Sequence, residues 1–318
     1  MRIIPASFFG IVLGLVGLGD CWRVATKAWG LPPIIAEFIM LFSFGVWLIL
    51  IGHYLFKCFL HRDEALAELN HPVQSCFIGL SGVATLLAAV AINPYAHSLA
   101  EILFIIGALV QLAYGIYFLG RSWMGGNDPS TLTAAIYLPS VAGNFVSAFV
   151  SGYLGYQEIG TLFFGAGLFS WLMIESLIAN RLYFNAALPE ALRPTMGIML
   201  APPVVGCIAY LFITKGHPDI IAQALFGYGL LQLLLLIRVL KWIFNAPFTA
   251  SYWAFSFGIT AIAFDSIIFV LRGMSGYIET LSIGLFIFAN AVLILLIVKT
   301  IMKLIGGSLI PPPLLIKN

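Results

Sequence analysis

The hydrophobic and polar positions of the chain fall into blocks, with ten apolar stretches separated by short polar segments. Each stretch is about twenty residues long, the length that a helix needs to cross the hydrocarbon of a bilayer. A helix satisfies its own backbone hydrogen bonds in lipid, whereas β-barrel strands are half as long and alternate in polarity. We therefore predict an all-α integral membrane protein, one domain over residues 1–318, with spans at 3 to 25, 34 to 56, 72 to 92, 98 to 120, 134 to 155, 158 to 182, 194 to 214, 219 to 243, 248 to 271 and 277 to 304.

Five prolines recur once for every two predicted spans, each in the first turns of an odd-numbered span. Proline is favoured at a helix start because its missing N–H has no partner there, which explains each proline taken alone. Their recurrence goes further and predicts five helical hairpins around a common axis. The prolines are Pro5, Pro72, Pro139, Pro194 and Pro247.

Composition and charge support the membrane assignment. Hydrophobic residues make up 61% of the 318 residues and charged residues 9%, too little charge for the surface of a soluble protein. Eleven of the fifteen basic residues fall on one side of the predicted spans, so the positive-inside rule predicts that both termini are cytoplasmic. We expect no attached soluble domain and no nucleic-acid partner. The eleven are Arg2, Lys57, Arg62, Arg121, Arg181, Arg193, Arg238, Lys241, Lys299, Lys303 and Lys317.

Ionisable residues are scarce in the odd-numbered spans, and spans 3, 5 and 7 contain no Asp, Glu, Lys or Arg as predicted. Ion-coupled carriers usually keep such a residue near the bilayer midplane. If the odd-numbered spans line one lumen, the positive ends of their helix dipoles surround its cytoplasmic mouth and attract anions weakly. We interpret Asp20 as paired with Arg23, and Asp265 stays a candidate transport residue. Three glutamates of even-numbered spans, interpreted as structural pairs between helices, are Glu37, Glu101 and Glu175.

No metal or cofactor pattern is present in the sequence. The histidines are scattered, and the four cysteines lie in or beside different spans without metal or disulfide spacing. We therefore expect no metal, no cofactor and no enzymatic activity, with a membrane enzyme as the alternative of a different class. The histidines are His53, His61, His71, His97 and His217.

Six stretches carry a resemblance to a known family: Pro5 to Gly14 (PASFFGIVLG), Tyr137 to Phe145 (YLPSVAGNF), Phe163 to Trp171 (FFGAGLFSW), Thr195 to Pro202 (TMGIMLAP), Phe226 to Leu234 (FGYGLLQLL) and Trp253 to Ala261 (WAFSFGITA). In order and spacing the chain closely resembles the bacterial tellurite-resistance/C4-dicarboxylate transporter (TehA-like) family, which is related to the slow-type anion channels of plant guard cells. The resemblance implies a homotrimer in the bacterial inner membrane. It also implies a pore in every protomer, with spans 1, 3, 5, 7 and 9 inside and five helices around them.

The same resemblance implies permeation of small anions past a phenylalanine side chain that plugs the pore midway. The gate of the family falls in the motif W-A-F-S-F-G, on the phenylalanine before the glycine, which is Phe257 here. An apolar ring across a narrow lumen excludes water, so an ion there loses hydration that nothing replaces. Gly258 leaves room for the ring to swing or the helix to bend. Phe255 points to another face of the helix and is the natural control.

Helical facing adds further pore-lining candidates, each with a structural alternative. The G-x-x-x-G pair of span 1 is also a motif of close helix packing. The paired prolines of span 7 break the helix, which is tolerated only where protein or water covers the freed carbonyl. The asparagine of span 5 either offers its amide to an anion or bonds to a neighbouring helix. The candidates are Gly10, Gly14, Asn144, Pro202, Pro203, Gly206 and Gly258.

Two mechanisms remain open for this architecture. We predict a passive channel for small monovalent anions such as chloride and nitrate, linked by the resemblance to tellurite resistance. The alternative is a secondary carrier for C4-dicarboxylates or tellurite oxyanions. The hairpin pattern favours the channel, because alternating-access carriers more often have inverted repeats with broken helices at a central site.

Overall fold

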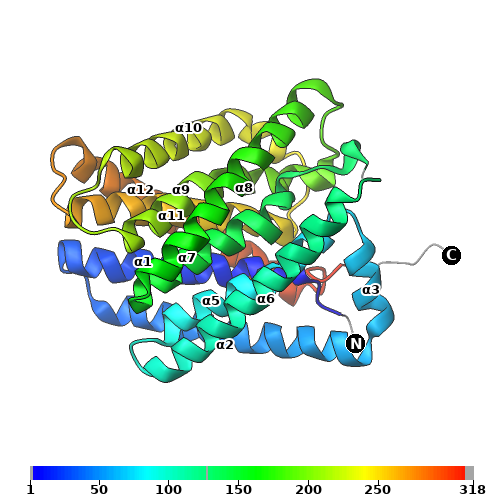
Figure 1. Cartoon of the computed structure of the whole chain (residues 1–318), viewed down its shortest axis with the longest axis horizontal. Helices are drawn as coiled ribbons and strands as arrows, with labels where there is room; N and C mark the ends of the chain where they lie inside the picture. The colour runs from blue at the N-terminus through cyan, green and yellow to red at the C-terminus, as the bar shows by residue number, and fades with distance from the viewer. Residues whose placement is uncertain (1–2, 127, 312–318) are drawn as a thin grey trace.

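The computed structural model describes residues 3–126 and 128–311, and ten helical segments of these residues are long and apolar enough to cross a membrane (Figure 1). The predicted all-α class with ten spans is confirmed, and every predicted end lies within four residues of the observed one. Two residues of the charge count, Arg2 and Lys317, lie outside the described residues. The spans are Ala6–Trp29, Pro33–Leu60, Ser75–Ile92, His97–Trp123, Ala134–Leu154, Gln157–Phe184, Glu190–Ile213, Ile220–Ile243, Ala250–Leu271 and Tyr277–Ile305.

The even-numbered spans are continuous α-helices, and the odd-numbered spans are not. The even-numbered spans are α2 (Pro33–Leu60), α6 (His97–Trp123), α8 (Gln157–Phe184), α10 (Ile220–Ile243) and α12 (Tyr277–Ile305). Regular α-helix fills the later part of each odd-numbered span, as α1 (Phe9–Trp29), α5 (Leu80–Ile92), α7 (Gly143–Leu154), α9 (Ala201–Ile213) and α11 (Ser256–Leu271).

Each odd-numbered span begins with a tighter, wider or interrupted helical segment. Three of these beginnings are 3-10 segments, at Ala6–Phe8, Glu190–Leu200 and Ala250–Phe255. Span 3 starts with the short α4 (Ser75–Ile78), and span 5 starts with a 3-10 turn, Ala134–Ile136, and a π-helical turn, Leu138–Ala142. Irregular backbone at membrane depth is tolerated where protein buries it or where it lines a cavity.

The recurring prolines lie at these irregular beginnings, although not always inside the first turn. Pro5 directly precedes a 3-10 turn, Pro139 is the second residue of the π-helical turn, and Pro194 lies inside a 3-10 segment. Pro72 and Pro247 precede their spans, each three residues before the first helical residue. Proline disfavours the α conformation in the residue before it, so a proline in the chain that leads into a span delays the regular helix.

Burial separates the two sets of spans. In the odd-numbered spans 72–89% of the residues of the apolar segment are buried, and in the even-numbered spans 28–33%. A helix that is apolar on all sides and buried by protein belongs to the interior of the molecule, whereas an apolar helix with an exposed side suits contact with lipid. The odd-numbered spans therefore form the interior of the bundle.

Contacts between helices give the order of the buried spans. Helix α1 packs against α5, α5 against α7, α7 against α9, α9 against α11, and α11 against α1, so the five form a closed ring. Each exposed helix packs against the buried helix before it and the next one around the ring. Figure 1 shows α2 and α10 along opposite edges of the bundle, with α1, α7, α9 and α11 between them. The hairpin arrangement around a pore stays a prediction.

Candidate functional site

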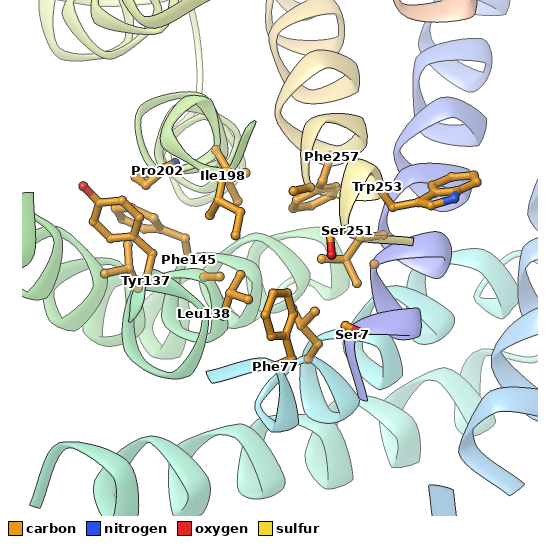
Figure 2. Close-up of a pocket in the computed structure, with 18 of the residues that line it drawn as sticks. Ser7, Phe77, Tyr137, Leu138, Phe145, Ile198, Pro202, Ser251, Trp253 and Phe257 are labelled. Atoms are coloured by element: carbon orange, nitrogen blue, oxygen red, sulfur yellow. The ribbon is translucent and has the colours of Figure 1, made fainter. Parts of the chain in front are cut away.

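An apolar cavity of about 50 Å³ lies where the five buried spans converge (Figure 2). Phe77 and Leu80 contribute to its wall from span 3, Leu138 and Phe145 from span 5, and Ile198 from span 7. Spans 1 and 9 complete the wall. The cavity therefore lies next to the irregular beginnings of the spans, as the rule for non-helical backbone at membrane depth requires.

Phe257 reaches this cavity from the first turn of α11. In Figure 2 its ring faces Ile198 of span 7, whereas the indole of Trp253 turns away from the cavity. The ring also lies close to α1, because a Cβ added to Gly17 would come within 3.4 Å of the Cδ2 atom of Phe257. The side chain of Phe257 thus fills space between spans 1, 7 and 9.

Phe255 lies on a different side of span 9. Its side chain is 7% exposed, and it is not part of the cavity wall. A Cβ added to Gly197 would come within 2.7 Å of the Phe255 ring, so this ring packs tightly against the 3-10 segment of span 7. The two phenylalanines therefore offer a matched pair of positions, one at the cavity and one in packing.

Two of the other pore-lining candidates, Gly10 and Pro202, lie in the cavity wall. Pro203 is buried outside this wall. The amide of Asn144 donates to the backbone oxygen of Ser140 at 2.6 Å, within its own span. Its Oδ1 is buried and has no hydrogen-bond partner among the described residues.

The remaining glycine candidates lie at close contacts between helices. A Cβ added to Gly14 would come within 2.5 Å of the Ser256 Cβ, and one added to Gly258 within 3.0 Å of the Leu200 side chain. At Gly206 a Cβ would approach the Phe145 ring to 3.0 Å. These glycines let neighbouring buried helices approach closely, as small residues do in membrane bundles.

Next to the cavity lies a wider chamber, the vestibule, whose volume is about 630 Å³. Four residues line both spaces, including the serines Ser7 and Ser251. The vestibule wall contains the beginnings of spans 1, 3, 7 and 9 and part of α3 (Arg62–Asn70). Near the end of the described chain, Ser308, Leu309 and Pro311 also line it. Both ends of the described chain therefore lie at this end of the bundle.

A buried ion pair ties α3 to the start of span 1. The ammonium of Lys57 lies 2.5 Å from Glu68 Oε2, and each side chain is 3% exposed. The other carboxylate oxygen of Glu68 accepts the backbone N–H of Ala6 at 2.8 Å, and Lys57 also donates to the backbone oxygen of Ile4 at 3.4 Å. A carboxylate of the chain itself therefore occupies the N-terminal end of the first buried span, where the helix dipole favours an anion.

His71 bonds to the backbone at the beginning of span 3. Its Nδ1 accepts the backbone N–H groups of Val73 and Gln74, both at 3.1 Å, which requires an unprotonated Nδ1. Burial lowers the pKa of His71 from its ordinary value, and the nearby carboxylate of Glu68 opposes this shift. His71 is therefore a neutral wall residue of the vestibule near pH 7.

Among the described residues of the vestibule wall, acidic side chains outnumber basic ones. One lysine, Lys57, stands against three glutamates, Glu64, Glu68 and Glu190. Glu190 forms an ion pair with Arg193 at 3.4 Å, and the glutamate is 62% exposed. The described side chains of the wall therefore provide no excess of positive charge, and the described groups that attract anions there are hydroxyls and backbone N–H groups.

The predicted pair between Asp20 and Arg23 is wrong. Arg23 instead binds Glu37 of α2 through two hydrogen bonds, at 2.7 and 3.0 Å, and donates to backbone oxygens at the end of span 3. The fork of the Arg23 guanidinium meets both carboxylate oxygens of Glu37 on the neighbouring helix, and this two-bond contact replaces the predicted pair with Asp20. The interpretation of Glu37 as a pair between helices is confirmed.

Asp265 is fully buried; among the described residues no N–H or O–H group donates to its carboxyl oxygens, and the thiol of Cys207, a weak donor, lies beside it. Arg272 donates to the backbone oxygens of Leu211 and Thr214 instead.

Glu175 lies in α8, which is the sixth span, and accepts hydrogen bonds from four side chains of spans 5, 6 and 8. The donors are Tyr137, Trp171, Tyr228 and Gln232. Among the described residues no three His, Cys, Asp or Glu side chains are grouped so as to hold a metal ion.

Two features were not predicted from the sequence: the serines where the vestibule meets the cavity, and the contact between Lys57 and Glu68. Ser7 lies three residues before Gly10, so helical facing already related it to a pore-lining candidate. Ser251 lies in a 3-10 segment, which helical facing does not place correctly. No local pattern joins Lys57 to Glu68.

These features define a multi-pass helical membrane protein in which a narrow apolar cavity opens to a vestibule at one end. The family model described as voltage-dependent anion channel (SLAC1) matches residues 4–301, and the chain belongs to this family.

Curated relatives agree with this assignment. The chain is 34% identical over 310 residues to a tellurite resistance protein TehA homolog of Haemophilus influenzae, covering 96% of this chain and 92% of that relative. It is 25% identical over 314 residues to the guard cell S-type anion channel SLAC1 of Arabidopsis thaliana, and 24% identical over 305 residues to the S-type anion channel SLAH3 of the same plant. These matches cover 94% and 93% of this chain but 55% and 48% of the plant proteins.

Proposed function

We propose that the chain is a passive anion channel with one pathway through each protomer, closed at Phe257. The observation that carries this proposal is that the ring of Phe257 lies in the wall of a cavity to which all five buried spans contribute. Membership in an anion channel family and the plant S-type anion channels among the relatives support the same function.

The size and chemistry of the cavity explain why the pathway is closed. A volume of about 50 Å³ holds at most a few water molecules and excludes an anion with its hydration shell. Phe77, Leu138, Ile198 and Phe257 surround this space with hydrocarbon, so an anion there loses water without gaining a partner. Such a constriction blocks ions by dewetting, and removing the ring of Phe257 widens it.

The junction between the vestibule and the cavity attracts anions weakly and does not bind them tightly. The hydroxyls of Ser7 and Ser251 lie where the vestibule meets the apolar cavity, and the beginnings of the buried helices direct backbone N–H groups toward the same end. The acidic excess of the vestibule wall opposes accumulation of anions. Weak attraction followed by an apolar constriction suits conduction, because an ion must be able to leave as well as enter.

Location, assembly and substrates complete the proposal. The excess of basic residues on the side of the termini supports a cytoplasmic vestibule in the bacterial inner membrane. The apolar surfaces of the even-numbered helices suit lipid and the contacts of a homotrimer, which the mass of the detergent-solubilised protein tests. Chloride and nitrate are the proposed ions, and a carrier for tellurite or C4-dicarboxylates is the alternative.

Electrical recording from reconstituted protein tests this function. Phe257→Ala is expected to raise the steady chloride and nitrate current by about tenfold or more over the wild type, which corresponds to a barrier lower by about 1.4 kcal/mol. Phe255→Ala removes the same ring from a packing contact and is expected to leave the current at the wild-type level. Absence of current from Phe257→Ala, together with saturable counterflow of malate, overturns the channel in favour of the carrier.

A further inference from the structure

Three phenylalanines from spans 5, 7 and 9 pack together beyond the cavity. The ring centroids of Phe149 and Phe212 lie 4.8 Å apart in an edge-to-face contact. Phe264 completes the group, with centroids 6.0 Å from Phe212 and 6.4 Å from Phe149. These are the distances of favourable aromatic pairs, so the three rings form one compact cluster, called the aromatic triad below.

Each member of the triad lies on the helix face that lines the cavity. Phe149 follows the cavity residue Ala142, the N-cap of α7, by seven positions, and Phe264 follows Phe257 by seven positions in α11. Phe212 follows the cavity residue Val205 by seven positions in α9. Residues seven positions apart share one side of an α-helix, so all three rings continue the face that borders the cavity.

The triad lies farther from the vestibule than Phe257. All three displacements run toward the C-terminal ends of the odd-numbered spans, and the vestibule lies at their N-terminal ends. Seven positions of α-helix correspond to about 10 Å along the axis. The triad therefore follows the cavity along the same line through the bundle.

Contacts between the helices place the triad inside the ring. Helices α7 and α11 lie on either side of α9 in the closed ring, so they are not neighbours of each other. Side chains of helices on either side of a third helix meet most directly across the inner side of the ring. The contact between Phe149 of α7 and Phe264 of α11 thus crosses the lumen side of α9. Phe149 and Phe264 are 3% and 4% exposed, so the cluster leaves little open space there.

We propose that the aromatic triad is a second constriction of the anion pathway, in series with Phe257. This inference rests on the proposed channel function. An anion that has passed Phe257 meets a second apolar segment, and the same dewetting argument applies to it. Removal of Phe257 alone therefore leaves the conductance limited by Phe149, Phe212 and Phe264.

Double substitutions test the second constriction. Addition of Phe264→Ala to Phe257→Ala is expected to raise the unitary chloride conductance roughly twofold or more, since two similar constrictions in series contribute comparable resistance. Phe269→Ala in the same background is the matched control. The Phe269 ring also belongs to α11 and is buried, but its centroid lies 5.1 Å from that of Phe226 on the exposed helix α10, outside the aromatic triad. An equal effect of Phe264→Ala and Phe269→Ala, or no effect of either, overturns the proposal.

Phe212→Ala tests the same constriction in case Phe264→Ala prevents folding. Phe212 is half-buried and belongs to a different span, so Phe212→Ala disturbs α11 less than Phe264→Ala and is expected to raise the conductance as well. Phe264→Ala with Phe257 intact is expected to stay closed. If Phe257→Ala passes no current at all, the channel function fails rather than the placement of the triad.

Chemical accessibility tests the placement without any current. In protein whose native cysteines are replaced, Phe257→Cys is expected to react with a membrane-impermeant anionic thiol reagent supplied at the vestibule. The same reagent supplied from the opposite side is expected to react slowly, and faster after Phe264→Ala. Fast reaction from the opposite side with the triad intact overturns the proposal, whatever ion the protein conducts.

Discussion

At the scale of single residues, the described polar groups along the proposed pathway are few and their positions are specific. Ser7 and Ser251 lie at the junction of the vestibule and the cavity, on the first and the last odd-numbered span. Other hydroxyls of span 9 are used within the helix, as in Ser266, which donates to the backbone oxygen of Ala263 at 2.7 Å. The two junction serines are therefore the hydroxyls best placed to meet an anion.

Replacement of both junction serines tests this role. In the Phe257→Ala background, Ser7→Ala with Ser251→Ala is expected to lower chloride conductance at low chloride concentration by roughly two- to tenfold, since one net hydrogen bond contributes about 0.5–1.5 kcal/mol. Conductance recorded over a series of chloride concentrations measures the effect. Ser266→Ala removes a hydroxyl of span 9 that is bonded within its own helix and serves as the control.

His71 predicts a pH dependence of stability. Its pKa is lower in the folded protein than the ordinary 6.5, so the folded state favours the neutral ring. The contribution of His71 is therefore present above pH 6.5 and is lost as the pH falls from 6.5 through the lower folded-state pKa. Asn at this position keeps an acceptor that does not titrate.

Thermal unfolding at a series of pH values measures this contribution. Between about pH 7.5 and about pH 5 the wild type is expected to lose more thermal stability than His71→Asn, because the other titrating groups are shared. Parallel losses in the two proteins contradict the assignment of the neutral ring.

At the scale of elements, the difference between continuous and irregular helices sets the architecture. The exposed helices satisfy every backbone group within regular α-helix, as lipid requires. The buried spans contain the 3-10 and π-helical segments, and these segments border the cavity and the vestibule. The helix α3 is held against the start of span 1 by Glu68, so it acts as part of the vestibule wall.

Loss of the buried ion pair is expected to destabilise this arrangement. Glu68→Gln leaves the ammonium of Lys57 buried without a charged partner, and breaking such a pair typically costs about 3–5 kcal/mol. Thermal unfolding in detergent is expected to show a clear decrease in the midpoint. Glu64→Gln, on the same helix and half-buried, is expected to change stability by less than about 0.5 kcal/mol.

At the scale of the whole molecule, the closed ring of buried helices surrounds the proposed pathway of the anion. The vestibule, the apolar cavity with Phe257 and the aromatic triad follow one another along this proposed pathway. Within the described part of the vestibule wall, acidic side chains are in excess, so the proposed selectivity does not rest on a cluster of fixed positive charges there. We therefore expect the proposed pathway to be controlled mainly by apolar side chains rather than by binding of the ion, and we expect removal of these side chains to open it.

Much of the candidate site was within reach of the sequence. Motif resemblance named Phe257 and separated it from Phe255, and the two rings do lie on different sides of span 9. Helical facing was less reliable near the vestibule. It assumes a regular α-helix, and residues such as Ser251 lie in 3-10 backbone, where the side-chain directions differ.

The sequence by itself determined the membrane class, the ten spans and their ends to within four residues, because the apolar length needed to cross a bilayer is a local property of the chain. Only the tertiary structure decided which side chains meet. Phe212 lies 63 residues after Phe149 and 52 residues before Phe264 in the chain, yet the three rings pack together. Lys57 and Glu68 belong to different helices and form an ion pair across the turn between them. Such contacts depend on the order of helices around the ring and on their rotation, and in uniformly apolar spans no polar stripe specifies either one.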